Sequence, residues 1–275
     1  MINTAKELDA ALQKGVSERS QIDQGSEVRS SDTVANGCEN PPTFLENARK
    51  LSRKGQALEV SVFLFLIVPS TVLSLFTAGQ WNHGFVVTAA AVIVRDIAMC
   101  SLVLYFLWRN ADPFQSIGWT FSFWPVHVAI GIFAFPVMFF GAMLAAFLFM
   151  KMGLSLPQST LRSVLAVRSW SQVPLAVLLV AVVAVTEETI FRGYLLLRLK
   201  NVSGNMPFAV VVSTVVFAMG HGYEGQAGIA TIGLLGLFFT LMYVGTNSLV
   251  APVVLHFLQD LVAVVVVPML TRGHQ

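Results

Sequence analysis

Six side chains of the types that hydrolyse peptide bonds or bind cations stand inside apolar segments of this sequence. They are Glu187, Glu188, Arg192, His221, His256 and Asp260. An ionised side chain in the middle of a bilayer costs roughly 2.5–3.5 kcal/mol on insertion scales, so such a residue is first interpreted as functional. A Glu–Arg pair or a lone histidine can be structural, but six such residues on three neighbouring segments favour a catalytic or ion-handling site.

Two pairs among them have the four-residue spacing that places side chains on one face of a helix. Glu188 precedes Arg192 by four residues, and His256 precedes Asp260 by four. Glu187 is rotated by about 100° from Glu188, so Arg192 can neutralise one glutamate while the other points to a different neighbour. The sequence leaves open which glutamate acts as a base.

The depths of these residues in the membrane are compatible with one site. At about 1.5 Å of rise per helical residue, Glu187 lies about 20 Å from the end of its apolar segment. His221 and His256 lie about 24 Å and 14 Å from loops on the same membrane side by the same rise. Helix tilt and loop length can close a difference of about 10 Å.

A second charged pair, Arg95 and Asp96, lies in an earlier apolar run. Because adjacent helical residues face different ways, we expect each to find another partner and to brace the core.

The composition is that of a membrane protein. Of the 275 residues, 55% are hydrophobic and 12% are charged, against about a quarter charged in soluble domains. Eight of the 17 Lys and Arg residues and eight of the 15 Asp and Glu residues fall within the first 54 positions. A net charge of +2 without a groove-reading motif argues against a nucleic-acid partner. Cys38 and Cys100 lie in different environments and have no metal-ligand spacing.

Seven apolar segments are long enough to cross a bilayer core, which needs about 20 helical residues. We therefore predict an all-α fold, a polytopic membrane helix bundle with about seven transmembrane helices (six to eight). This bundle is expected to occupy residues 58–270, with a motif-bearing core at 173–268 and an interfacial helix within 151–172. The predicted spans are 58–78, 85–108, 125–150, 173–197, 206–222, 228–244 and 247–268.

Residues 1–57 have the composition of a polar, largely disordered cytoplasmic tail and lack the apolar core of a signal peptide. A short amphipathic helix at 44–54 is expected either to lie on the membrane surface or to act as a linker. With this tail inside, the inner flanks of the spans carry seven Lys and Arg residues and the outer flanks four. We expect a multi-pass integral protein of the cell (inner) membrane with its N-terminus in the cytoplasm.

Three motifs resemble those of the CPBP intramembrane endopeptidases, also called the CAAX protease or Abi family. EETIFR at 187–192 resembles the Glu-Glu-x-x-x-Arg motif, FAMGH at 217–221 resembles Phe-x-x-x-His, and HFLQD at 256–260 resembles His-x-x-x-Asn/Asp. Each motif alone is a weak signal, whereas their order and separations together are specific. The resemblance covers about residues 173–268.

The resemblance implies a CAAX-type intramembrane endopeptidase, a hydrolase acting at the lipid bilayer on a peptide or lipidated protein. Glu187 would be its catalytic carboxylate, and Arg192 would hold the acidic pair. His221 would bind or activate water, and His256 with Asp260 would stabilise the oxyanion. The best-known members cut the last three residues from prenylated proteins, whereas bacterial members are linked to peptide maturation and bacteriocin immunity. Neither the substrate nor its prenylation therefore follows.

Position 260 departs from the best-studied form of the third motif, which has asparagine there. An ionised Asp260 has no N–H and cannot donate to an oxyanion, so it is protonated, orients His256 or binds a metal. Zn²⁺ would activate water by lowering its pKa. Because the sequence lacks a compact His-Glu-x-x-His pair, we favour a glutamate-activated water without a cofactor. The candidate zinc ligands are Glu187, His221, His256 and Asp260.

Two other functional classes remain open. A non-proteolytic member of the family, such as an immunity factor, can use the same buried site to bind a peptide or partner protein. Membrane carboxylates and histidines also serve as proton or ion relays. The oligomeric state does not follow from the sequence.

Overall fold

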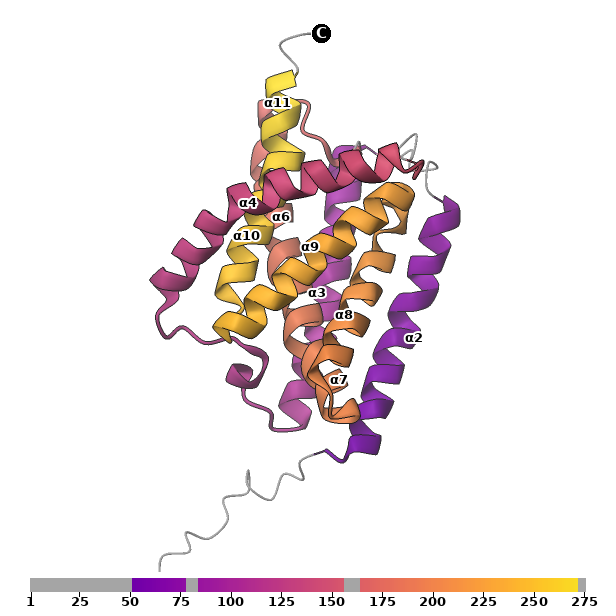
Figure 1. The fold of residues 1–275 in the computed structure, drawn as a ribbon, viewed down its shortest axis with the longest axis vertical. Helices are drawn as coiled ribbons and strands as arrows, with labels where there is room; N and C mark the ends of the chain where they lie inside the picture. The colour runs from indigo at the N-terminus through magenta and orange to yellow at the C-terminus, as the bar shows by residue number, and fades with distance from the viewer. Residues whose placement is uncertain (1–50, 78–83, 156–163, 272–275) are drawn as a thin grey trace, which may run out of the picture. The chain divides into compact units, whose positions relative to one another are not determined.

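Every element described in the computed structural model is a helix, as the all-α prediction required (Figure 1). The structure describes residues 51–77, 84–155 and 164–271, without the side chains of 68–77. Two π-helical segments, η3 (Thr189–Leu195) and η5 (Val262–Val266), continue α6 into α7 and α10 into α11. The α-helices are α2 (Arg53–Thr77), α3 (Phe85–Arg109), α4 (Trp124–Lys151), α6 (Val173–Glu188), α7 (Leu196–Ser203), α8 (Met206–Gly220), α9 (Gly225–Thr246), α10 (Val250–Leu261) and α11 (Val267–Thr271).

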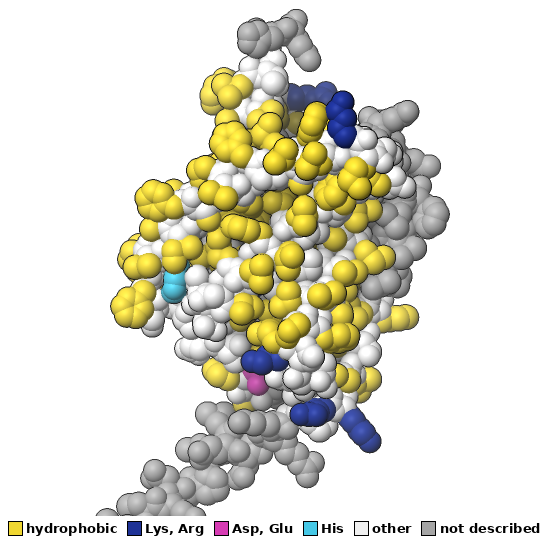
Figure 2. Space-filling model, viewed as in Figure 1, with side chains coloured by type: hydrophobic (Ala, Val, Ile, Leu, Met, Phe, Trp, Pro, Cys, Tyr) yellow, Lys and Arg dark blue, Asp and Glu magenta, His cyan; other side chains and the backbone are white. Residues whose placement is uncertain are grey.

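Helices occupy all seven ranges predicted as membrane spans. α8, in the predicted span 206–222, is apolar but has only 15 residues, fewer than the roughly 20 that a bilayer core needs. α2, in the predicted span 58–78, has 25 residues. Figure 2 shows apolar side chains across the middle of one face and Lys or Arg side chains near its two ends, as lipid contact requires. The protein is therefore a multi-pass helical membrane protein. Within the described residues, the stretches long and apolar enough to span a bilayer are Phe85–Arg109, Trp124–Lys151, Trp170–Ser203, Gly222–Thr246 and Val250–Thr271.

The helix that carries the first motif, α6, packs against both α3 and α10. Ala176 of α6 and Ala89 of α3 are fully buried in one apolar cluster, and small residues let membrane helices approach closely. On its other side α10 packs against α4, where a Cβ added at Gly131 would lie 2.7 Å from the carbonyl oxygen of Ala251. Figure 1 shows α4 and α9 running obliquely across the more upright helices. These contacts hold the first and third motifs on adjacent helices.

A tight turn from α7 to α8 brings the second motif beside the first. Gly204 ends α7 at φ +70°, a left-handed conformation that favours glycine. The side chain of Asn205 then caps α8 by accepting from Phe208 N at 2.9 Å. Because α8 returns along η3, the rings of Phe191 and Phe217 meet with centroids 5.1 Å apart.

Buried polar side chains tie α2, α3 and η3 together at one end of the bundle. Glu59 of α2 is 4% exposed and accepts from Arg109 Nη2 and Asn110 Nδ2, each at 2.8 Å. Its other oxygen accepts from Tyr194 Oη at 3.2 Å and lies 3.5 Å from Arg198 Nη2. The buried carboxylate is thus compensated by several donors, which fixes the chain that follows the first motif.

The segment 151–172, predicted to contain an interfacial helix, is described only in part. Within it, Leu165 and Val167 pack inside the bundle and are buried. Val167 N donates to Val264 O of η5 at 3.0 Å, so this part does not lie flat on a membrane surface. Trp170 of the same segment remains 76% exposed. The predicted tail and most of its amphipathic helix lie outside the described residues, and α2 already begins at Arg53 rather than 58.

Candidate active site

Glu188, Arg192 and His256 form a buried charged cluster between the first and third motifs. Arg192 Nη1 donates to Glu188 Oε1 at 2.8 Å, and His256 Nδ1 lies 2.8 Å from the same oxygen. Glu188 is 0% exposed and Arg192 1%, so the pair is removed from water and lipid. The predicted four-residue pairing forms, although the chain is π-helical from Thr189. Cationic partners of this kind are what make a buried carboxylate tolerable.

Arg192 is also held by α9, which the sequence did not indicate. Its Nη2 donates to the carbonyl oxygen of Gly236 at 3.2 Å, and its guanidinium lies 4.1 Å from the ring centroid of Phe217. A Cβ at Gly236 would lie 2.8 Å from Phe217 and 3.3 Å from Arg192 Nη2. Phe239 stacks on His256 with centroids 5.2 Å apart. Gly236 and Phe239 therefore belong to the candidate site. The sequence did not mark them, because α9 is an apolar helix that contains other glycines and another phenylalanine.

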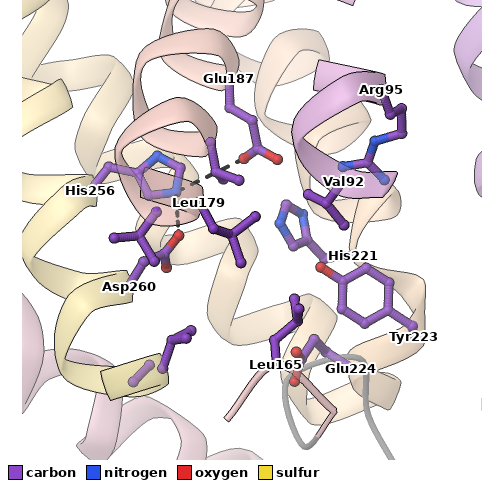
Figure 3. A pocket seen from close by; sticks show the side chains of 14 residues that line it. Val92, Arg95, Leu165, Leu179, Glu187, His221, Tyr223, Glu224, His256 and Asp260 are labelled. Atoms are coloured by element: carbon purple, nitrogen blue, oxygen red, sulfur yellow. Dashed lines mark ion pairs between the residues drawn. The ribbon is translucent and has the colours of Figure 1, made fainter. Parts of the chain in front are cut away.

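Glu187 faces away from this cluster and into a cavity (Figure 3). Its Oε2 lies 3.9 Å from His256 Nε2 and has no hydrogen-bond partner in the part of the chain that the structure describes. The Glu187 side chain is 14% exposed, against 0% for Glu188. The helical rotation between the two residues has therefore separated one enclosed carboxylate from one that a water or substrate can reach.

His256 lies between carboxylates on both sides of its ring. Its Nδ1 contacts Glu188, and its Nε2 lies 3.4 Å from Asp260 Oδ2, as Figure 3 shows for the second contact. Donation from both ring nitrogens requires a proton on each, which is the imidazolium form. The predicted four-residue pair of His256 and Asp260 thus forms, with the aspartate against the imidazole. Asp260 is the more accessible of the two, with 29% of its side chain exposed.

His221 completes the cavity wall opposite Glu187 (Figure 3). α8 ends at Gly220, so His221 sits at its C-cap rather than inside a span that continues to 222. Its Nδ1 lies 2.9 Å from the carbonyl oxygen of Phe217, which can only accept. In the neutral ring Nδ1 therefore carries the proton, and Nε2 keeps a lone pair for a water or another donor.

Two cavities of about 100 Å³ each meet at Glu187 and His221. The first cavity is also lined by His256 and Asp260 of α10. It therefore contains Glu187, His256 and Asp260, and the two carboxylates lie near the same ring nitrogen of His256. The second cavity adds Asp96 and apolar residues such as Met99 and Ile190. Tyr223 lines both, although no motif marked it. The structure thus brings the six predicted site residues together. Five of them are linked through contacts with His256 or Glu188, and His221 lies across the cavity.

Arg95 and Asp96 correct one of our predictions. They pair with each other rather than with other partners. Arg95 Nε donates to Asp96 Oδ1 at 2.8 Å, and Nη2 lies 2.7 Å from the same oxygen. Arg95 also lines both cavities beside Glu187, so the pair belongs to the site region and not to a distant structural brace.

The candidate zinc ligands do not form a ligand shell in this arrangement. Among the described residues, no group of three or more His, Cys, Asp or Glu side chains is placed to hold a metal ion. Both ring nitrogens of His256 face carboxylates, and Nδ1 of His221 is bonded to the backbone. Glu187, His221, His256 and Asp260 line one cavity without converging on a point between them.

Residues 169–262 match the model of a protein family described as type II CAAX prenyl endopeptidase Rce1-like. The matched stretch contains all three motifs and all six predicted site residues but not α2, α3 or α4. This agrees with the resemblance carried by the motifs. Searches of curated proteins and of solved structures found no match to the chain.

Proposed function

We propose that this protein is an intramembrane endopeptidase of the CAAX protease family, since residues 169–262 match a model of that family. Its reaction is hydrolysis of a peptide bond in a membrane-associated or lipidated protein or peptide. The observation that carries this proposal is the position of Glu187, whose Oε2 is free of hydrogen bonds from the described residues and faces a cavity with two histidines. Peptide hydrolysis needs such a base beside an oxyanion stabiliser.

In the proposed reaction Glu187 accepts a proton from a water molecule whose oxygen attacks the scissile carbonyl carbon. His221 Nε2 accepts the water's second hydrogen and so orients the attack. The carbonyl oxygen becomes an oxyanion, and the Nε2–H of His256, which lies 3.4 Å from Asp260 Oδ2 without substrate, turns to donate to it. Glu187 then returns its proton to the amide nitrogen as the C–N bond breaks, which releases a carboxylic acid and an amine, and the acid passes its proton to the amine.

Glu188, Arg192 and Asp260 act through their neighbours in this proposal. Arg192 and His256 share Glu188 Oε1, so the enclosed glutamate fixes both cations. Asp260 contacts Nε2 of His256 and keeps the imidazole protonated and oriented, which replaces the amide donor of an asparagine at this position. The departure at 260 is then accommodated because the histidine, not the aspartate, donates to the oxyanion.

The test is a comparison of cleaved membrane proteins in cells that express wild type or Glu187→Gln at equal levels. We expect new protein termini in wild type that are absent with Glu187→Gln, because the amide cannot accept a proton from water. Val185→Ala is the matched control, since Val185 lies on the same helix and is 38% exposed. Glu187→Gln must remain inserted and folded, as measured by its thermal unfolding in detergent.

Other outcomes of this comparison favour the other functions. Full biological activity of Glu187→Gln would contradict proteolysis and favour a binding or immunity protein. Cleavage that is lost after chelation and restored by zinc would replace the glutamate mechanism with a metal-dependent one. The expected result is activity that survives chelation in the purified protein.

A further inference from the structure

Tyr223 lies where the two cavities meet and has no part in the proposed catalytic steps. Four of the described residues line both cavities, namely Arg95, Glu187, His221 and Tyr223. The proposed reaction uses Glu187 and His221, and Arg95 is paired with Asp96. Tyr223 is therefore the residue at this junction whose polar group has neither a proposed role nor an ion-pair partner.

The Tyr223 ring is held by the short turn that joins α8 to α9. This turn is the helical segment η4 (Gly222–Glu224), whose last backbone N–H donates to the carbonyl oxygen of His221 at 2.9 Å. The centroid of the Tyr223 ring lies 5.8 Å from that of His221, and the ring packs against the apolar cluster that contains Leu179. Backbone and ring are thus fixed in advance, so a bound molecule does not have to order the hydroxyl group.

The hydroxyl group of Tyr223 faces the cavity. Figure 3 shows the ring directed from η4 toward the cavity, with its oxygen beside His221. Within the part of the chain that the structure describes, this oxygen forms no hydrogen bond, whereas the hydroxyl of Tyr194 donates to Glu59. A phenolic hydroxyl can donate and accept, and in a buried place it usually has a partner. The position beside Tyr223 therefore suits a polar group of a bound molecule.

The main chain of a peptide substrate carries such groups. Each peptide unit has an N–H and a C=O, and both lose their contacts with water when the chain enters a site inside a membrane protein. In the proposed reaction the scissile unit lies at Glu187, and the neighbouring units follow at about 3.3–3.6 Å per residue. Because Tyr223 lines both cavities, a chain that runs from one cavity into the other passes its hydroxyl group.

We propose that Tyr223 binds the main chain of the substrate. Its hydroxyl donates a hydrogen bond to the carbonyl oxygen of a peptide unit next to the scissile one. This contact holds the chain across the junction of the two cavities and keeps the scissile carbonyl within reach of Glu187 and His256. The inference rests on the proposed endopeptidase function and adds a substrate contact that lies outside the three motifs.

The first experiment adds Tyr223→Phe to the comparison of protein termini in cells. Phenylalanine removes only the hydroxyl and keeps the ring beside His221, so the Tm in detergent should stay near that of wild type. We expect the new termini to form roughly tenfold more slowly, because a substrate carbonyl is left without its donor. Tyr105→Phe is the matched control, since Tyr105 of α3 is 48% exposed and lines neither cavity.

The second experiment separates a substrate contact from a structural role. Peptides that span a cleavage site found in wild-type cells are made with an ester in place of each amide next to the scissile bond in turn. They are cleaved by the purified full-length protein in proteoliposomes. An ester carbonyl is a weaker acceptor than an amide carbonyl, so at one position wild type should lose roughly three- to tenfold in kcat/KM. Tyr223→Phe should lose little more with that ester, because both changes remove the same hydrogen bond.

The outcomes distinguish this inference from the function on which it rests. If wild type produces no new termini, the endopeptidase function fails and the inference fails with it. If wild type cleaves and Tyr223→Phe forms the same termini equally fast, the contact is overturned while the endopeptidase function stands. Losses from the ester and from Tyr223→Phe that add fully at every position would also overturn the contact, because independent changes share no hydrogen bond.

Discussion

Two adjacent glutamates in one motif have different surroundings, and we infer that this difference divides their roles. Glu188 receives two cationic donors on one oxygen and is fully enclosed. Glu187 reaches the cavity and is near His256 only through the opposite ring nitrogen. An enclosed carboxylate with fixed cations is suited to holding a site together, whereas a carboxylate beside open space is suited to proton transfer. The two positions should therefore respond differently to the same substitution.

Glu188→Gln is expected to lower stability as well as activity. Removing one partner leaves Arg192 as a buried charge without its carboxylate, which costs about 3–5 kcal/mol in buried pairs. Thermal unfolding in detergent should show a clear fall in Tm for Glu188→Gln and a much smaller one for Glu187→Gln. Equal Tm values for the two variants would contradict this division of roles.

Gly236→Ala is expected to impair the site although alanine is the better helix former. The added Cβ would lie 2.8 Å from the Phe217 ring and would press on Arg192, so the cluster must shift. Gly245, on the same helix, has open space around it and provides the matched control. Activity should fall at least tenfold in Gly236→Ala, a loss of about 1.4 kcal/mol, and stay near wild type in Gly245→Ala. Similar activity in both variants would remove Gly236 from the site.

At the scale of elements, π-helical segments follow the motif helices and are held by neighbours. A π-turn leaves backbone carbonyls outside the regular α-helical pattern, and such turns are frequent at functional sites. In η3 the carbonyl oxygen of Phe191 accepts from Ser213 Oγ of α8 at 2.8 Å. In η5 the carbonyl oxygen of Val264 accepts from Val167 N. Because these acceptors need partners in a dry interior, each wide turn fixes how the next element packs.

Ser213→Ala should destabilise the protein by leaving the Phe191 carbonyl without its donor. Ser213 is 1% exposed, and an unsatisfied buried acceptor costs about 1–3 kcal/mol. Ser61→Ala is the comparison, because Ser61 is exposed and, among the described residues, its hydroxyl bonds to Ala57 O of its own helix. Unfolding by heat should distinguish the two variants, and an unchanged Tm in Ser213→Ala would show that η3 does not depend on this contact.

The whole molecule places a charged site inside an apolar exterior. Five described stretches are long and apolar enough to cross a bilayer, and Glu188, Arg192 and His256 among them face one another rather than lipid. α4 illustrates the exterior, since its 28 residues carry a single charged side chain, Lys151, at its last position. Substrate must therefore reach the cavity through or beside the membrane, which fits the proposed membrane-associated or lipidated substrate.

The orientation of the chain is a separate prediction that two cysteines make testable. Cys38 lies in the predicted tail, and Cys100 is partly buried in α3. A membrane-impermeant maleimide should label Cys38 of a Cys100→Ser variant only after the cells are permeabilised, since the basic flanks favour a cytoplasmic N-terminus. Labelling of intact cells would reverse the proposed orientation. The variant Cys38→Ser with Cys100→Ser provides the unlabelled control.

The sequence by itself determined the helices, their approximate limits and six candidate residues of the site. A bilayer requires long apolar helices, and that requirement is written along the chain without reference to partners. The pairs Glu188–Arg192 and His256–Asp260 were also predictable, because a four-residue spacing fixes neighbours within one helix. The role of Asp260 could not be predicted from the sequence, because it depends on which groups surround the His256 ring.

Only the tertiary structure decided which glutamate is enclosed and what else enters the site. Glu188 is enclosed because His256, 68 residues away, lies against the oxygen that Arg192 also binds, and Gly236, 44 residues from Arg192, supplies a carbonyl. The place of Arg95 beside Glu187 likewise depends on how α3 packs on α6. Contacts between distant helices arise from the fit of whole surfaces, and no local spacing encodes them.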